Sequence, residues 1–228
     1  MPSPRRGFCY LPAMRIPVYL EVGAGGATRA WALALPGVAV DAATPEAALA
    51  ALPAAVAGEV ALLAAAGHPW PHAAAPLEFV ETERVDTNVK LEEGAARALF
   101  KWDLRPTTPA DVAATLARVN LACRAIEAAH AADPPVATAP TGLRLIATAN
   151  EFIWLLSRLG SRPTDVLPGG AMPRLLAAEK VVVERLTNLL PGDLERHAVF
   201  AGEPWTTRKV MRRLAHAARE ESLATAAS

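Results

Sequence analysis

Glu221 is the side chain of the C-terminal segment whose type and position could best support chemistry. With about 100° of rotation per helical residue, Glu221 shares a stripe with Val210, Leu214 and Ala217, whereas His216 falls on the opposite side. A carboxylate on an otherwise apolar stripe has to be paired, solvated or protonated. Two interpretations stay open: water reaches Glu221 at a frayed last turn of the helix, or Glu221 faces a polar pocket.

A second polar group, Asn150 and Glu151, interrupts an apolar helical pattern earlier in the chain. Asn150 and Glu221 could face a small ligand, and Trp154 and Trp205 could form walls of such a pocket. Tryptophans at helical spacing are also typical of a protein core, so both could simply pack in the interior. No glycine-rich phosphate loop, Ser-His-Asp set or Cys-His pair accompanies these candidate pocket residues.

The other histidines do not form a metal site by their spacing. His68 and His72 are four residues apart, as in a helical metal pair, but the intervening prolines rule out a regular helix and favour a surface loop. His130 falls at the end of a predicted helix, where it can cap carbonyl groups. His197 falls in an acidic loop with no partner nearby in the sequence.

The last predicted helix is rich in basic residues on the arc away from its apolar stripe. These are Arg208, Lys209, Arg212, Arg213 and Arg219. Acidic residues follow directly in the sequence, so the pattern favours a solvated or ion-paired surface over a nucleic-acid-binding surface. The formal net charge of the chain is +0, which gives no bulk attraction to nucleic acid or to anionic lipid.

The composition indicates a folded protein without a disulfide framework. Of 228 residues, 52% are hydrophobic and 20% charged, which suits two small domains with packed cores. The two cysteines, Cys9 and Cys123, cannot form a thiolate zinc site, and Cys123 lies on an apolar stripe where we expect burial. The alanine-rich segment 47–67 is interrupted by Pro53 and Glu59, which argues against a membrane span.

Residues 1–13 contain prolines and adjacent arginines without periodicity, which predicts a loose tail. Translation starting at Met14 is an alternative explanation, because a strand pattern begins there abruptly. Nothing at the N-terminus has the form of a signal peptide, so we expect a cytoplasmic protein.

Residues 14–85 are predicted to form a small α/β domain, followed by a connector over 86–107. The predicted strands cover residues 14–22, 28–35, 38–42 and 77–85. Thr44 and Pro45 begin a helix as N-cap and first helical residue. The sequence Leu-Pro-Gly at 35–37, followed by Thr-Pro-Glu-Ala-Ala-Leu at 44–49, resembles HicB-type domains. This resemblance implies a module of the kind that masks a small toxin ribonuclease.

Residues 108–224 are predicted to form a four-helix bundle. The helices are expected over about 108–131, 141–160, 173–190 and 206–222. Because their connections are short, we expect an up-down bundle. The fold class is therefore α+β, with the small α/β domain preceding the bundle.

Residues 151–160 and 205–214 resemble helices of DinB-like bundles, which usually bind a divalent metal through three inward histidines. The resemblance places those ligands at Ala147, Ala217 and Glu221. An alanine has no lone pair to donate, so the resemblance implies a degenerate metal site.

Three functions follow as hypotheses. The first is a metal-free DinB-like protein that acts by binding a small molecule, with self-association into a homodimer through its apolar helices. The second is a divalent-metal-dependent transferase, isomerase or hydrolase of that superfamily. A one-residue shift of the alignment would make His216 a ligand in such an enzyme, but would turn it outward. The third is a HicB-type protein with a small toxin-like partner.

Overall fold

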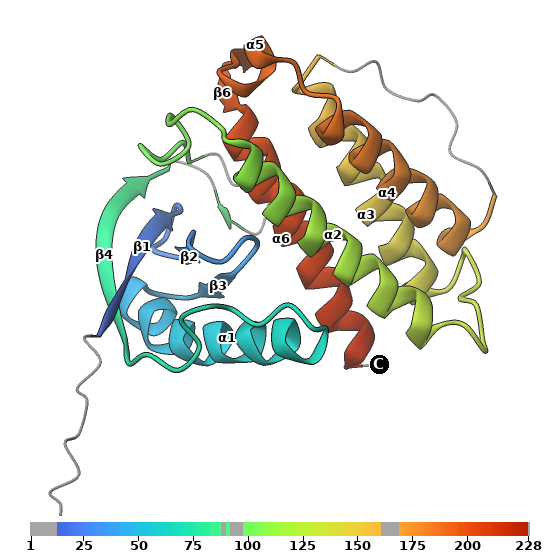
Figure 1. The fold of residues 1–228 in the computed structure, drawn as a ribbon, viewed down its shortest axis with the longest axis horizontal. Helices are drawn as coiled ribbons and strands as arrows, with labels where there is room; N and C mark the ends of the chain where they lie inside the picture. Colours follow the sequence, from blue (N-terminus) through green and yellow to red (C-terminus); the bar gives the residue numbers. More distant parts are fainter. Residues whose placement is uncertain (1–12, 88–89, 92–97, 161–168, 228) are drawn as a thin grey trace, which may run out of the picture.

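The computed structural model describes residues 13–87, 90–91, 98–160 and 169–227, which form an α+β fold. A four-stranded sheet with one covering helix lies beside a group of four long helices (Figure 1). The predicted tail 1–13 lies outside the described residues except for Ala13, and so does part of the predicted connector.

The sheet has the strand order β3-β2-β1-β4. Its strands are β1 (Met14–Val22), β2 (Thr28–Ala32), β3 (Ala39–Ala42) and β4 (Leu77–Asp86). The first three strands are antiparallel neighbours, whereas β4 pairs parallel to β1 after the crossover through helix α1 (Pro45–Ala65). Gly25 and Gly26, with φ of 85° and 88°, make the tight turn between β1 and β2. All four predicted strands are confirmed, although β2 ends earlier than predicted.

Helix α1 covers one face of this sheet. Its side chains Leu52 and Val56 pack on Val18 and Leu20 of β1 in one apolar core. Among the described residues, α1 is the one helix that is long and apolar enough to span a membrane, with a mean hydropathy of 1.9. The sequence argument against a span is therefore wrong in its premise, because Pro53 does not interrupt the helix. Of the most apolar part of α1, 22% is buried inside the fold.

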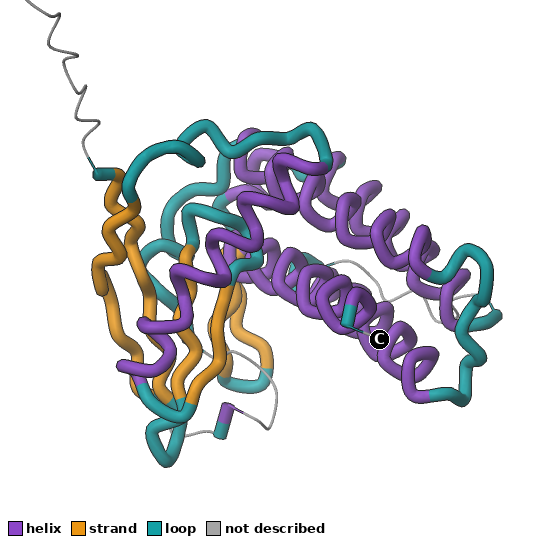
Figure 2. The backbone as a smooth tube through the Cα atoms, turned by 90° about the horizontal axis from the view of Figure 1, so that it is seen from below, coloured by secondary structure: helices purple, strands orange, loops and turns teal. Residues whose placement is uncertain are grey.

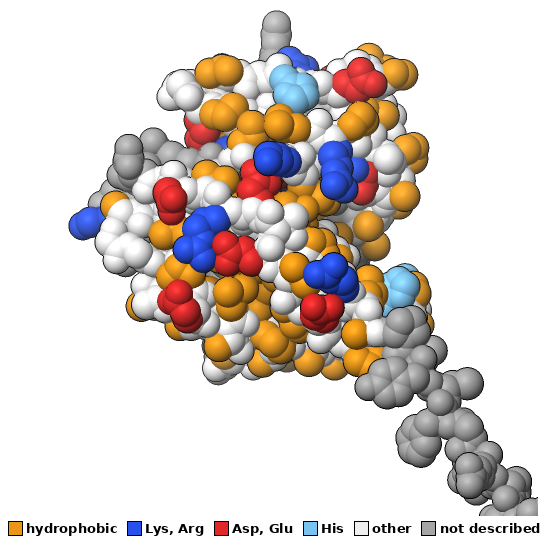
Figure 3. Space-filling view, turned by 90° about the vertical axis from the view of Figure 1, so that its left-hand side faces the viewer, with side chains coloured by type: hydrophobic (Ala, Val, Ile, Leu, Met, Phe, Trp, Pro, Cys, Tyr) orange, Lys and Arg blue, Asp and Glu red, His pale blue; other side chains and the backbone are white. Residues whose placement is uncertain are grey.

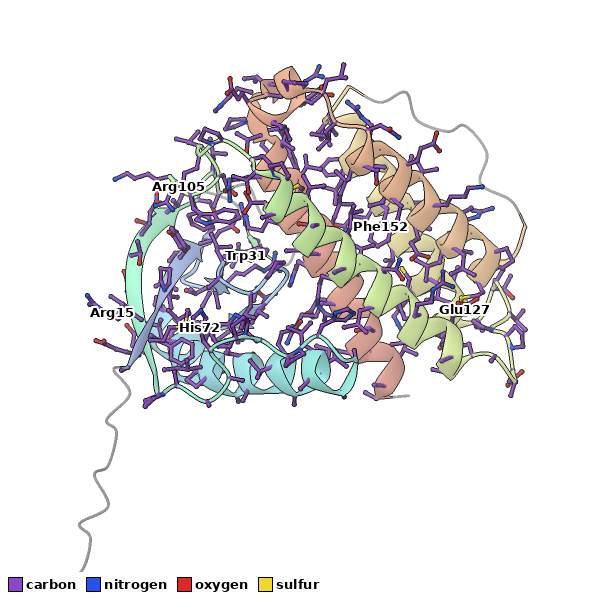
Figure 4. The ribbon with its side chains drawn as sticks, in the orientation of Figure 1. Arg15, Trp31, His72, Arg105, Glu127 and Phe152 are labelled. Carbon is purple, nitrogen blue, oxygen red and sulfur yellow. The ribbon has the colours of Figure 1, made fainter. Side chains whose placement is uncertain are left out.

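The bundle consists of α2 (Pro109–Ala129), α3 (Pro140–Ser157), α4 (Ala171–Thr187) and α6 (Thr207–Ala226). The hydroxyl groups of Thr108 and Thr206 cap the starts of α2 and α6. The interior is apolar and includes Cys123 and Phe152, both fully buried (Figure 4). The predicted helices and the predicted burial of Cys123 are confirmed.

The directions of the helices differ from the predicted up-down arrangement. Arg185 near the end of α4 donates to the carbonyl of Leu159 just after α3, so these two helices run parallel (Figure 1). The connection 158–170 explains the difference. A helix of 18 residues is about 27 Å long, and thirteen extended residues can span about 43 Å. A connection of this length does not restrict the next helix to the antiparallel direction, as a short connection would.

Helix α6 runs antiparallel to α3 and parallel to α2. Arg213 pairs with Glu151 whereas Glu221, two turns further along α6, contacts Thr148 earlier in α3. The sequence predicted no strands between α4 and α6, but the structure contains the short helix α5 (Pro191–Leu194) and a hairpin of β5 (His197–Phe200) and β6 (Glu203–Thr206). His197 therefore belongs to a strand and not to a loop.

The sheet and the bundle lie side by side (Figure 2), and α6 contributes to both. Tyr19 and Trp31 on the sheet face opposite α1 pack with Phe100 of the predicted connector in a separate apolar core. Trp31 in turn contacts His216 and Arg212 of α6 (Figure 4). The second face of the sheet is thus covered by the connector and by α6.

Candidate functional site

The basic side of α6, which the sequence predicts to be a solvated or ion-paired surface, is ion-paired but buried. Arg212 and Asp103 are almost fully excluded from solvent and form a bidentate pair at 2.7 and 3.1 Å. The guanidinium of Arg212 also lies 4.5 Å from the ring centre of Trp31. The prediction of solvation was wrong because a second structural unit, the sheet, packs on this side of the helix.

The other basic residues of α6 also have acidic partners. Lys209 pairs with Glu203 at 2.9 Å, and Arg219 pairs with Glu59 at 3.2 Å. Arg208 pairs with Asp111. On the face that Figure 3 shows, basic and acidic side chains are likewise interspersed. This arrangement does not favour binding to nucleic acid.

A cleft of about 770 Å³ lies where α3, α6 and strand β2 meet. Helix α6 forms one side of it, α3 a second, and Arg29 of β2 contributes from the sheet. The residues that line it are Arg29, Arg144, Thr148, Asn150, Glu151, Trp154, Arg213, His216, Ala217, Glu220, Glu221 and Ala224. Its volume is in the usual range of small-molecule sites.

The cleft brings together most of the candidate residues that the sequence singled out. Asn150, Glu151, Trp154 and Glu221 all line it. Trp205 is buried behind the wall, with its ring centre 5.3 Å from that of Trp154 in an edge-on arrangement.

Two of the three metal positions implied by the DinB-like resemblance, Ala217 and Glu221, line this cleft, but Ala147 does not. Ala147, Asn150 and Trp154, which lie on one side of α3 at helical spacing, are exposed and do not face into the bundle. The interior side of α3 is instead formed by residues such as Leu145 and Phe152. Helical spacing gives only the relative angles of the side chains around α3. Nothing in the sequence fixes which side of the helix its neighbours cover, so the inward side of α3 could not be identified.

Glu221 is not at a frayed end, because α6 continues to Ala226 and Glu221 is 6% exposed. The hydroxyl of Thr148 donates to Glu221 Oε2 at 3.4 Å, and Arg144 Nε lies 3.5 Å from Oε1. Burial raises the pKa of Glu221 above its ordinary value, and the nearby charge of Arg144 opposes this shift.

The sequence did not indicate that arginines line the cleft. Arg144, Thr148 and Glu151 are spaced i, i+4 and i+7, so they form one polar stripe along α3. That spacing could have revealed this wall of the site. The contribution of Arg29 from β2 could not have been found, because no local pattern relates the sheet to α3.

His216 was expected to face outward, but its side chain is only 13% exposed and lies between α6 and the sheet. Its Nδ1 lies 3.1 Å from the carbonyl oxygen of Gly37, and its ring centre lies 4.9 Å from that of Trp31. Burial, with a further contribution from the charge of Arg29, lowers the pKa of His216 to about 3. The imidazole is therefore neutral at physiological pH.

Within the described ranges, no three His, Cys, Asp or Glu side chains lie close enough together to hold a metal ion. Burial raises the pKa of the Cys123 thiol, so this cysteine is not a thiolate ligand. His68 and His72 lie in an exposed loop before β4, as the sequence indicated. His130 is the C-cap residue of α2, but it caps carbonyl groups through its backbone N–H, and its buried side-chain Nε2 has no hydrogen-bond partner.

Comparisons of the chain with protein-family models, with curated proteins and with solved structures found no match. The chemistry of the cleft is therefore inferred from its own residues.

Proposed function

We propose that this chain is a metal-free binding protein that takes up a small organic molecule in the cleft between α3, α6 and β2. The cleft supports this proposal because it combines the exposed indole of Trp154 with a small set of charged groups in one concave site. Such a combination is typical of ligand sites, where an apolar wall supplies affinity and a few polar groups fix orientation. The proposal retains the resemblance of the bundle to DinB-like proteins, with α3 and α6 as the helices that face the ligand.

The charges of the cleft favour binding of an organic molecule over binding of a metal ion. The cleft holds the guanidinium groups of Arg29, Arg144 and Arg213 and the carboxylates of Glu151, Glu220 and Glu221. Its formal charge is therefore balanced and gives a cation no net attraction. The nearest carboxylates are engaged by these or other arginines, including Glu151 by Arg213. A divalent-metal-dependent reaction would have to displace such pairs before the ion found a ligand.

The test is a thermal-shift screen of the full chain with organic acids, amines and neutral aromatic compounds, repeated on a variant in which the cleft is filled. Ala217→Phe places a ring in the cleft, whereas Ala57→Phe adds the same volume on the exposed side of α1 and is the matched control. Compounds that stabilise the native chain should lose their effect with Ala217→Phe and keep it with Ala57→Phe. Equal shifts in both variants, or no stabilising compound at all, would contradict the proposed function.

Metal content is tested separately on protein purified without a tag. We expect elemental analysis to find no stoichiometric divalent metal and chelator to leave the unfolding temperature unchanged. One equivalent of bound zinc or nickel would instead support the metal-dependent alternative. Light scattering coupled to size-exclusion chromatography tests the predicted homodimer.

A further inference from the structure

Arg213 is a buried cation of the cleft whose hydrogen-bonding capacity is not used up. Its side chain is 9% exposed, and Nη2 donates to Glu151 at 2.7 Å. Its Nε and Nη1 groups are buried without a hydrogen-bond partner. A buried N–H group without an acceptor is costly, by about 1–3 kcal/mol. A ligand acceptor can reach this guanidinium only by displacing Glu151, and a ligand that then supplies the missing acceptors gains affinity from this residue.

Arg144, one of the α3 residues that line the cleft, is similarly under-used. Its Nε and Nη2 groups have no hydrogen-bond partner, and the 3.5 Å separation from Glu221 exceeds the usual length of a charge-assisted hydrogen bond. Arg29 differs, because Asp41 accepts from its Nε and Nη2 at 2.6 Å each. The unused donors of the cleft are therefore those of Arg144 and Arg213, which belong to α3 and α6.

An apolar surface lies in the same cleft. Trp154 is 39% exposed. Its ring lies edge-on to Trp205 and 4.2 Å from the guanidinium of Arg158, and these two contacts support it. A supported ring of this kind keeps a fixed position, so a flat apolar group can stack on it at little entropic cost.

We propose that the cleft binds an organic carboxylate with a flat apolar body: Arg213 binds the carboxylate, assisted by Arg144, and Trp154 contacts the body. This inference rests on the proposed function and specifies its ligand class. A guanidinium matches a carboxylate because two parallel N–H groups can donate to its two oxygen atoms. Amines are disfavoured, because the more exposed acids of the cleft, Glu151 and Glu220, already accept hydrogen bonds from Arg213 and Arg219.

Glu151 is the internal competitor of the ligand. It is 35% exposed, so its side chain can turn toward solvent when a ligand carboxylate takes its place on Arg213. The exchange leaves the charge around Arg213 unchanged, since one carboxylate replaces another. Removing the charge of Glu151 should therefore strengthen binding, which is the opposite of the effect expected if Glu151 itself held the ligand.

The experiment measures binding of 2-naphthoate, 2-naphthylmethanol and 2-naphthylmethylamine to the full chain by isothermal titration calorimetry. These probes share the ring system and differ in the group that would meet Arg213. We expect 2-naphthoate to bind at least about tenfold more tightly than the other two, because a hydrogen bond to a charged group contributes about 1.5–3 kcal/mol. Equal affinities, or preference for the amine, would overturn the inference.

Four variants assign the contacts. Arg213→Gln should weaken 2-naphthoate binding by about tenfold or more, Trp154→Ala by about two- to tenfold, and Glu151→Gln should strengthen it. Lys180→Gln removes an exposed positive charge on α4 and should change nothing. Because Arg213→Gln also frees Glu151, circular dichroism checks its fold. If that variant unfolds, Arg144→Gln replaces it with a smaller expected loss.

The outcomes separate the two proposals. If neutral or cationic compounds bind in a manner that Ala217→Phe abolishes while carboxylates do not bind, the ligand class is wrong and the proposed function stands. If Ala217→Phe has no effect on any ligand, both fail.

Discussion

The imidazole Nδ1 of His216 lies 3.1 Å from the carbonyl oxygen of Gly37, which joins α6 to the turn between β2 and β3. Because a carbonyl oxygen only accepts, the neutral imidazole must carry its proton on Nδ1 and donate it. The ring also lies edge-on to Trp31. A histidine that the sequence placed on the outer side of a bundle is thus a link between the sheet and the bundle.

This link should make stability depend on pH. Burial lowers the pKa of His216 from 6.5 to about 3 in the folded chain. Below pH 6.5 the unfolded chain therefore binds a proton that the folded chain excludes. The stabilising contribution is complete above pH 6.5 and is lost as the pH falls toward 3, by at most about 1.4 kcal/mol per pH unit.

The measurement is urea unfolding between pH 7 and 4.5. His216→Asn keeps a donor for Gly37 but cannot titrate, so its free energy of unfolding should fall less steeply with acidification than that of the unaltered chain. His68→Asn alters an exposed loop histidine and should leave the slope unchanged. Identical slopes for His216→Asn and the unaltered chain would show that His216 is protonated in the folded state.

Gly37 itself should not tolerate a side chain. It has a φ of +84°, and an added Cβ would lie 2.6 Å from the carbonyl oxygen of Ala215 in α6. Gly37→Ala should therefore lower the free energy of unfolding by more than the roughly 1 kcal/mol expected from the positive φ alone. Gly25→Ala, which also has a positive φ but meets no atom within 4 Å, is the control for that backbone term. Equal losses in the two variants would mean that α6 does not press on this turn.

The buried pair of Asp103 and Arg212 predicts a larger effect. Asp103→Asn leaves the guanidinium of Arg212 without its counter-charge in a site closed to water, so we expect a loss of about 3–5 kcal/mol. Glu78→Gln breaks the exposed pair with Arg15 and should cost about 0–1 kcal/mol. Chemical denaturation at pH 7 compares the two, and similar small losses would show that water reaches Asp103.

Local signals in the sequence were sufficient to predict most of the helices and strands. Thr44, Thr108 and Thr206 each precede a helix and cap it, and the glycines at 25 and 26 make the predicted turn. Such features depend on a few consecutive residues, so they can be identified without knowing the rest of the fold. The strands and helices were accordingly predicted, apart from the helix α5 and the hairpin at 197–206, whose elements have only four residues each.

The arrangement of these elements could not be predicted in the same way. Helix α6 packs on both the sheet and the bundle. Its basic residues, which the sequence assigned to a surface, are therefore buried between them. Whether Arg213 pairs with Glu151 or with another acid depends on how α3 meets α6, which no local pattern encodes. The cleft was anticipated through Asn150, Glu151, Trp154 and Glu221, whereas its arginines were not.

Glu59 is the one charged residue in the middle of α1. Its carboxylate accepts from Arg118 Nη2 at 3.0 Å and from Arg219 Nε at 3.2 Å, so it joins α1 to both α2 and α6. All three side chains are almost fully buried. Burial lowers the pKa of Arg118, as expected for a cation removed from water. Glu59 is the carboxylate that the two guanidinium groups share, although Arg219 also donates to Glu220 at 2.9 Å.

Glu59→Gln should destabilise the chain by about 3–5 kcal/mol, because the buried Arg118 then loses its counter-charge and Arg219 keeps only Glu220. Glu46→Gln, an exposed change in the first turn of the same helix, is the control and should have little effect. Replacing the pair together, as Glu59→Leu with Arg118→Met, should recover part of the loss, because apolar side chains of similar size need no counter-charge. Urea denaturation gives the free energies. If Glu59→Gln costs less than about 1 kcal/mol, or the double variant is no more stable than Glu59→Gln, the cluster does not hold the sheet unit against the bundle.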